Sequence, residues 1–221
     1  MLITMAVMII VFLAVGNLLN TLIKTSNTVS SRMLVREEGE YLAEVFRKYI
    51  RNSSVDNVRL FYRDDPTIVF GENYQVNSIA GSVETLADVD FATELHFHPS
   101  VDTNRVVCMG FFKDGNDENK GYIVRSSVTG VSIAGGYEPS MCFNPSSGDF
   151  KKNFMVLNSD LVYVEGLEVR QDTTTTNVYY SIDIDMKPYW GLGGMSNYRD
   201  TEGSPRYRKS FVVQTRLLYH W

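Results

Sequence analysis

Charge and proline are both missing from the start of this chain. The first 23 residues carry no charged side chain, and no proline occurs before Pro66. Because proline is the residue that most strongly interrupts a helix, its absence favours one uninterrupted helix across this region. Zinc-binding spacings are missing too, since Cys108 and Cys142 form no Cys-x-x-Cys pair. The sequence therefore predicts no zinc-cluster framework.

The common sequence signatures of enzymes are absent as well. The chain has no Gly-x-Ser-x-Gly elbow, no phosphate-binding loop and no dinucleotide-binding glycine pattern. Cys108 lies in the apolar run Val106–Met109, and apolar surroundings keep a thiol protonated and unreactive. We therefore expect no enzymatic activity, no catalytic residue, no resident metal and no cofactor.

The composition indicates one β-rich domain behind a long helix. The chain has 221 residues, of which 44% are hydrophobic and 21% charged, with a net charge of −5. Removing roughly 50 residues for the helix leaves about 170, which suits one domain with its own core. Thirteen tyrosines and twelve phenylalanines favour β structure. The mild acidity argues against a dedicated nucleic-acid surface.

The uncharged N-terminal run is long enough to cross a membrane. At about 1.5 Å per residue it reaches ~35 Å, against a hydrocarbon layer of ~30 Å. A buried core helix rarely runs this long without charge, and a signal peptide needs a basic start and a shorter apolar core. We predict three parts: residues 1–23 as a transmembrane or filament-core half, 24–52 as an amphipathic half, and 53–221 as a globular head.

The amphipathic half predicts a helix face that packs on a sheet. Its apolar residues recur at three- and four-residue spacing. They are Leu34, Leu42, Val45, Phe46, Tyr49 and Ile50. Gly39 interrupts this stripe at a cost of up to ~1 kcal/mol, which indicates close packing there.

Beyond residue 52 the pattern changes to short alternating runs between turns. The predicted strands are Val58–Tyr62, Thr67–Phe70, Glu94–His98, Arg105–Phe112, Gly121–Ser126, Val131–Ala134, Phe154–Leu157, Leu161–Arg170, Asn177–Met186 and Ser210–His220. No strand–helix–strand rhythm occurs, so the predicted fold class is α+β, with a long N-terminal helix packed against an antiparallel sheet. The polar, glycine-rich residues 191–209 are predicted to form a loop.

Three polar groups have both a binding and a structural interpretation. His96 and His98 share one face of a strand and either start a metal site or are surface or cross-strand histidines. Asp114, with Asn116, Asp117 and Glu118, either holds calcium or forms a solvated turn, and it lacks the EF-hand spacing.

The third group is basic. Arg206, Tyr207, Arg208 and Lys209 either contact nucleic acid or act as solubilising residues beside an apolar strand. The cysteine pair is likewise open, because Cys108 and Cys142 either form a disulfide or remain two buried thiols.

Residues 1–16, MLITMAVMIIVFLAVG, together with the amphipathic run to Arg51, resemble the N-terminal helix of type IV pilins and pseudopilins. Family members commonly begin, after a basic leader ending in Gly, with Phe-Thr-Leu-Ile/Val-Glu and then Met/Leu-Leu-Ile-x-x-Ala. The start Met1-Leu2-Ile3 matches the stretch just after that Glu. The chain therefore looks truncated, by a start codon placed inside the helix or by the boundaries of the cloned segment.

The resemblance implies roles for individual residues. It implies a membrane and assembly helix presenting Leu2, Ile3, Val7, Ile10, Phe12, Leu13, Leu18 and Leu22. It also implies that Gly16 and Asn17 soften this helix midway. The size of the head resembles that of minor pilins or the larger minor pseudopilins.

The resemblance further implies a structural subunit of a type IV pilus, type II secretion or competence filament. Such a subunit waits in the inner membrane as a single-pass protein with an extracytoplasmic head. A prepilin peptidase and an ATPase-driven machine then bring it into a pilus or periplasmic pseudopilus with other subunits. Two rival functions are a single-pass membrane protein with a ligand-binding or adhesive head, and a DNA-uptake pilin that uses the basic group at 206–209.

Overall fold

A computed structural model provides the structure of the chain. It describes residues 2–72, 75–85, 90–99, 104–117, 120–131, 137–173, 178–188 and 207–215.

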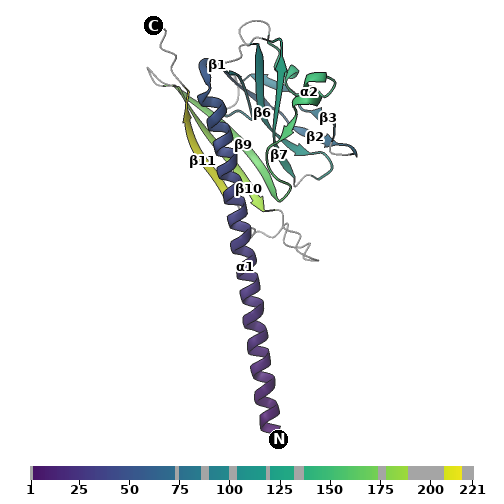
Figure 1. Ribbon diagram of the computed structural model, residues 1–221, viewed down its shortest axis with the longest axis vertical. Helices are drawn as coiled ribbons and strands as arrows, with labels where there is room; N and C mark the ends of the chain where they lie inside the picture. Colours follow the sequence, from purple (N-terminus) through teal and green to yellow (C-terminus); the bar gives the residue numbers. More distant parts are fainter. Residues whose placement is uncertain are drawn as a thin grey trace.

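One long helix and a two-sheet head make up the molecule. Helix α1 (Leu2–Arg51) is continuous over 50 residues and runs through Gly16 and Asn17 without interruption. Figure 1 shows its N-terminal half projecting away from the head and its C-terminal half lying against the sheets. The long uninterrupted helix and the mixed α and β content confirm the predicted α+β fold class.

The larger sheet has eight strands in the order β3-β2-β6-β5-β1-β4, with β7 paired to β6 and β8 paired to β7. These strands are β1 (Ser53–Arg63), β2 (Thr67–Phe70), β3 (Val76–Ala80), β4 (Val83–Thr85), β5 (Glu94–Pro99), β6 (Arg105–Asp114), β7 (Gly121–Thr129) and β8 (Met155–Val156). The pair β2–β6 is parallel, whereas the other described pairs are antiparallel. The antiparallel prediction therefore holds with this one local exception.

The smaller sheet carries the helix. Its three strands are β9 (Val162–Thr173), β10 (Val178–Pro188) and β11 (Tyr207–Gln214), in the order β11-β10-β9. Buried and half-exposed residues alternate along β10, as the sequence predicts for a strand with one wet face. Two hydrogen bonds between Ala92 and Val169 join this sheet to the larger one.

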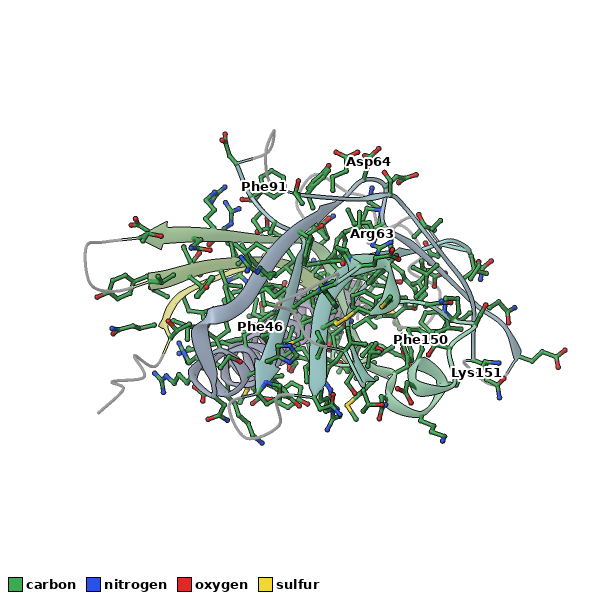
Figure 2. The ribbon with its side chains drawn as sticks, turned by 90° about the horizontal axis from the view of Figure 1, so that it is seen from above. Phe46, Arg63, Asp64, Phe91, Phe150 and Lys151 are labelled. Carbon is green, nitrogen blue, oxygen red and sulfur yellow. A yellow bond between two sulfur atoms is a disulfide. The ribbon has the colours of Figure 1, made fainter. Side chains whose placement is uncertain are left out.

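Two apolar clusters lie on opposite faces of the larger sheet. Along β6, Val107, Met109 and Phe111 belong to the cluster that α1 covers. Val106 and Phe112 belong to the other cluster, together with residues from the short 3₁₀ helix η2 (Pro139–Met141), its flanking segments and helix α2 (Gly148–Asn153). Figure 2, which looks along the long axis, shows Phe46 of α1 and Phe150 of α2 apart from each other, with strands between them.

Gly39 lets α1 approach the smaller sheet closely. A Cβ atom at this position would lie 2.8 Å from Met186 Cε and 3.0 Å from Tyr207 Cε1. The prediction that something packs closely at Gly39 is confirmed, and the partners are strands β10 and β11.

The strand predictions miss two strands and misplace the start of the last one. Strands β3 and β4 are absent from the predicted set, because they are short and their side chains are mostly half-exposed or exposed. Residues 207–209 of the predicted loop pair with β10 as the start of β11, so the loop prediction is wrong there. Val131 is not in a strand, and residues 132–134, the end of the last predicted strand beyond residue 215, and residues 191–206 of the predicted loop lie outside the described residues.

Candidate functional site

The N-terminal half of α1 is apolar on every side and makes no packing contact with the described head. Its large apolar side chains from Met5 to Ile23 are between 49% and 73% exposed. They are Met5, Val7, Met8, Ile9, Ile10, Val11, Phe12, Leu13, Val15, Leu18, Leu19, Leu22 and Ile23. The side chains of Leu2 and Ile3 lie outside the described set, while Val7, Ile10, Phe12, Leu13, Leu18 and Leu22 lie on this surface.

Leaving this surface in water is costly. At about 1.5–3 kcal/mol for each large apolar side chain, the thirteen residues together correspond to roughly 20–40 kcal/mol. A helix that is apolar all round is stable when lipid or other protein surrounds it.

The C-terminal half of α1 is fixed to the head by a buried stripe. Leu42, Ala43, Phe46 and Ile50 are fully buried in the cluster shared with the sheets. Predicted stripe residues Leu34, Val45 and Tyr49 pack against that cluster while remaining partly exposed. The direction of the exposed half of α1 is therefore set by the head.

Polar contacts hold the same half of the helix in register. Lys209 Nζ of β11 donates to Glu40 Oε1 at 2.5 Å, and the backbone N–H of Ser159 donates to Glu38 Oε1 at 2.8 Å. The hydrogen bond from Lys209 lowers the pKa of Glu40. Arg125 of β7 donates to Tyr49 Oη at 2.7 Å. These contacts join α1 to both sheets.

The described residues of the basic group at 206–209 have different surroundings in the structure. Arg206 lies outside the described residues, and Tyr207 packs against the helix-side cluster. Arg208 is paired with Asp185 at 3.3 Å and lies 3.7 Å from Glu168, while Lys209 is bonded to Glu40. Arg208 and Lys209 therefore have acidic partners within the protein, which would compete with phosphate. Contact with nucleic acid stays a prediction.

The turn after β6 uses Asp114 for internal hydrogen bonds. Its Oδ1 accepts from the backbone N–H of Asn116 at 2.9 Å, and its Oδ2 accepts from Tyr122 Oη at 3.0 Å. Burial, together with the charge of Asp114, raises the pKa of Tyr122. Glu118 lies outside the described residues. The arrangement is that of a turn closed by its own aspartate.

The two predicted histidines are buried, so the interpretation as surface histidines is wrong. His96 and His98 are 0% and 4% exposed. His98 Nδ1 lies 2.8 Å from the carbonyl oxygen of Arg105, whereas His96 faces Cys108 across the β5–β6 pair. The segment from Tyr137 to Phe143 contacts the same face, because the rings of both residues lie against that of His96. The alternating polar residues of β5 are therefore internal.

A chain of polar contacts runs through this buried face. Arg63 of β1 is paired with Glu94 through its Nε, and His96 Nε2 lies 3.1 Å from Glu94 Oε2. Burial opposes the charge on Glu94, but His96 and Arg63 together hold the pKa of this carboxyl below its usual value. In the neutral tautomer that donates Nε2–H to this carboxylate, His96 Nδ1 is the acceptor nitrogen.

That acceptor nitrogen meets Tyr137 and the cysteine pair. Tyr137 Oη lies 2.7 Å from His96 Nδ1 and 3.0 Å from Cys142 Sγ. The sulfur atoms of Cys108 and Cys142 are joined in a disulfide, with their Cα atoms 6.0 Å apart. Burial, and then the charge of Glu94, raise the pKa of Tyr137, so its phenol is neutral and donates to the imidazole.

No family model, no curated protein and no solved structure matches this chain. Among the described residues, one helix is long and apolar enough to cross a membrane. It lies near the N-terminus, and its most apolar stretch is not buried against the rest of the protein. A single apolar N-terminal helix with a β-rich head fits a single-pass membrane protein.

Proposed function

We propose that this protein is a non-enzymatic structural subunit, a minor pilin or pseudopilin, of a type IV pilus, type II secretion or competence filament. The observation that carries the proposal is the continuity of α1, which is apolar all round in its first half and fixed to two sheets in its second half. An ordinary membrane anchor needs only an apolar segment. In a filament subunit, a rigid helix also sets the position of the head relative to the filament core.

Residues 5–23 of α1, which we call the assembly helix, exchange one set of surroundings for another during assembly. Before assembly lipid covers its side chains, and in the filament the same side chains pack against helices of other subunits. Because lipid is as apolar as leucine, close side-chain packing decides the balance between these two states. Gly16 and Asn17 are proposed to soften the helix for this packing, and both lie in regular helix.

The proposed partners are other pilin or pseudopilin subunits, the membrane, a prepilin peptidase and an assembly machine. The proposed location is the inner membrane with the head outside the cytoplasm, followed by the pilus or periplasmic pseudopilus. The rival function, a membrane protein with a ligand-binding or adhesive head, predicts that the assembly helix stays in lipid.

Site-specific photocrosslinking separates the two functions. A photoreactive residue replaces Phe12, which is 73% exposed, in cells of the host with and without the motor ATPase of filament assembly. We expect crosslinks to other apolar helices only when the ATPase is present. The matched control is the same residue at Val212, which is 61% exposed on β11. Lipid adducts alone in both strains would favour the rival.

A charged substitution tests whether the assembly helix inserts into a membrane. Leu13→Arg places a charge near the centre of the apolar half, where insertion costs about 2.5–3.5 kcal/mol, or roughly a hundredfold in the insertion equilibrium. We expect loss of the protein from the membrane fraction. Val212→Arg, an equal change on an exposed residue of the head, should leave membrane association unchanged.

A further inference from the structure

We propose that His96, Cys108 and Cys142, which we call the thiol–imidazole cluster, form a Zn²⁺ site when the cysteines are reduced and a closed disulfide when they are oxidised. The ligand atoms are Nδ1 of His96 and the two Sγ atoms. This site is independent of the proposed filament function, because it lies in the head, away from the assembly helix.

The three donors already lie close together. Their ligand atoms are within 4.8 Å of one another, and all three residues are completely buried. Donor atoms around one tetrahedral Zn²⁺ lie about 3.5–4 Å apart, given bond lengths of ~2.0–2.3 Å. The two sulfurs are bonded in the disulfide, so reduction must first release them and let them move apart before both can bind one ion. His96 and Cys108 are held opposite each other by the β5–β6 register.

The imidazole of His96 is held by a carboxylate, as the imidazoles of metal-binding histidines usually are. Histidines that bind a metal usually donate their second ring N–H to a carboxylate, which fixes the ring and the tautomer. Here Glu94 accepts from Nε2 of His96 and is itself held by Arg63, so Nδ1 is directed to the sulfur side. A Cβ at Gly110 would lie 2.9 Å from Glu94 Cγ, so the glycine makes room for this carboxylate. A disulfide by itself requires none of these groups.

Tyr137 lies beside all three donors. Its Oη lies 2.7 Å from His96 Nδ1, 3.0 Å from Cys142 Sγ and 3.9 Å from Cys108 Sγ. Zn²⁺ at Nδ1 would take the lone pair that accepts from this hydroxyl in the oxidised state, so the neutral phenol would turn away from Nδ1 and add no charge to the site. Three protein donors leave the fourth position of a tetrahedral shell open to an exchangeable ligand.

Charge balance selects a divalent ion. Two thiolates and a neutral imidazole neutralise Zn²⁺, and the Glu94–Arg63 pair is neutral by itself, so no net charge is buried. A monovalent ion such as Cu⁺ would leave one negative charge without a partner. Thiolate and imidazole ligands suit Zn²⁺, and oxygen-preferring ions such as Ca²⁺ and Mg²⁺ do not fit this donor set.

Conversion of the disulfide to the Zn²⁺ site takes two electrons and no net protons. A dithiol reductant supplies two electrons and two protons, the bond between the sulfur atoms of Cys108 and Cys142 breaks, and the reductant becomes a disulfide. Zn²⁺ then binds both sulfurs and releases the two thiol protons to water. Oxidation of the cysteines by a disulfide oxidant reverses both steps and expels the ion.

The test uses the full chain in detergent micelles, with Co²⁺ as a spectroscopic probe and Zn²⁺ as its competitor. We expect the reduced chain to bind one Co²⁺ with a thiolate charge-transfer band and tetrahedral d–d bands. Zn²⁺ should abolish these bands and slow alkylation of both cysteines at least about tenfold. The oxidised chain should bind neither ion. Absence of binding to the reduced chain, or its unfolding on reduction, would overturn the proposal.

Variants separate the cluster from nonspecific binding. Glu94→Gln should weaken Zn²⁺ binding about 10- to 100-fold, and His96→Ala should weaken it further. The matched control is His98→Ala, which removes a second buried histidine of β5 and should leave Zn²⁺ affinity unchanged. If His96→Ala fails to fold, X-ray absorption of the Zn²⁺-loaded wild-type chain decides the question. A shell with two sulfurs and one imidazole supports the site, and a shell without imidazole contradicts it.

Discussion

Enlarging Gly39 tests whether close contact between α1 and the smaller sheet holds the head together. A Cβ atom at this position would lie 2.8 Å from Met186 Cε, 3.0 Å from Tyr207 Cε1 and 3.4 Å from Lys209 Cβ. The methionine end can move, but the tyrosine ring and the lysine stem both belong to β11, two positions apart on the strand face that meets α1. Gly39→Leu adds three more carbons beyond that Cβ. We therefore expect α1 to be pushed away from the sheet.

The magnitude follows from two opposing terms. Replacing glycine by leucine in a helix contributes about 1 kcal/mol of helix propensity. Overpacking a tight site costs typically about 1–3 kcal/mol, and here the displaced helix also weakens the Glu40–Lys209 contact. The difference between the two terms is a loss of up to about 2 kcal/mol. For a head of this size, Tm falls by about 2–4 °C for each kcal/mol, so we expect a decrease of up to roughly 8 °C.

The assay is thermal unfolding of the full chain in micelles, followed by near-ultraviolet circular dichroism of the head. The matched control is Gly16→Leu, where an added Cβ has nothing within 4 Å, and its Tm should not fall. Unfolding of Gly39→Leu at or above the wild-type temperature, or an equal loss of stability in both variants, would contradict tight packing of α1 at Gly39.

Three further predictions concern the core, the acid response and the cysteines. Phe46→Ala, at a fully buried position under the sheets, should cost about 3–5 kcal/mol and lower the urea midpoint. Because the pKa of Glu94 is lowered in the folded head, its ionised form stabilises the fold above its ordinary pKa of about 4.3, and this stabilisation is lost as the pH falls through the lowered value. Urea midpoints measured between about pH 3 and pH 7 should therefore fall more steeply in acid for the wild type than for Glu94→Gln, and equal slopes would contradict the assignment. Reduction of the Cys108–Cys142 disulfide, which spans 34 positions, should lower the free energy of unfolding by about 4 kcal/mol while the head stays folded.

Much of the fold could be predicted from local pattern. The order of apolar and amphipathic helix, the stripe from Leu34 to Ile50 and the strand at Thr67–Phe70 agree with the structure. These features depend on residues three or four positions apart in a helix and two apart in a strand, so the sequence by itself contains them. Close packing at Gly39 could be predicted in the same way, because this glycine interrupts a regular apolar stripe.

The buried polar cluster could not be predicted in this way. The sequence rule for zinc sites looks for close cysteine and histidine spacing, whereas His96, Cys108 and Cys142 come from two strands and the end of η2. The sequence placed His96 and His98 on one face of a strand. It gave no sign that the segment around Tyr137 contacts that face.

The sequence alone determined that this protein is a long helix, apolar in its first half, followed by a β-rich head, because both elements follow from short-range periodicity. Only the tertiary structure decided which strands pair, including the parallel contact of β2 with β6, and which polar residues become internal. Those choices depend on cross-strand neighbours and covering segments that lie tens of residues apart, and no local period records which of them meet.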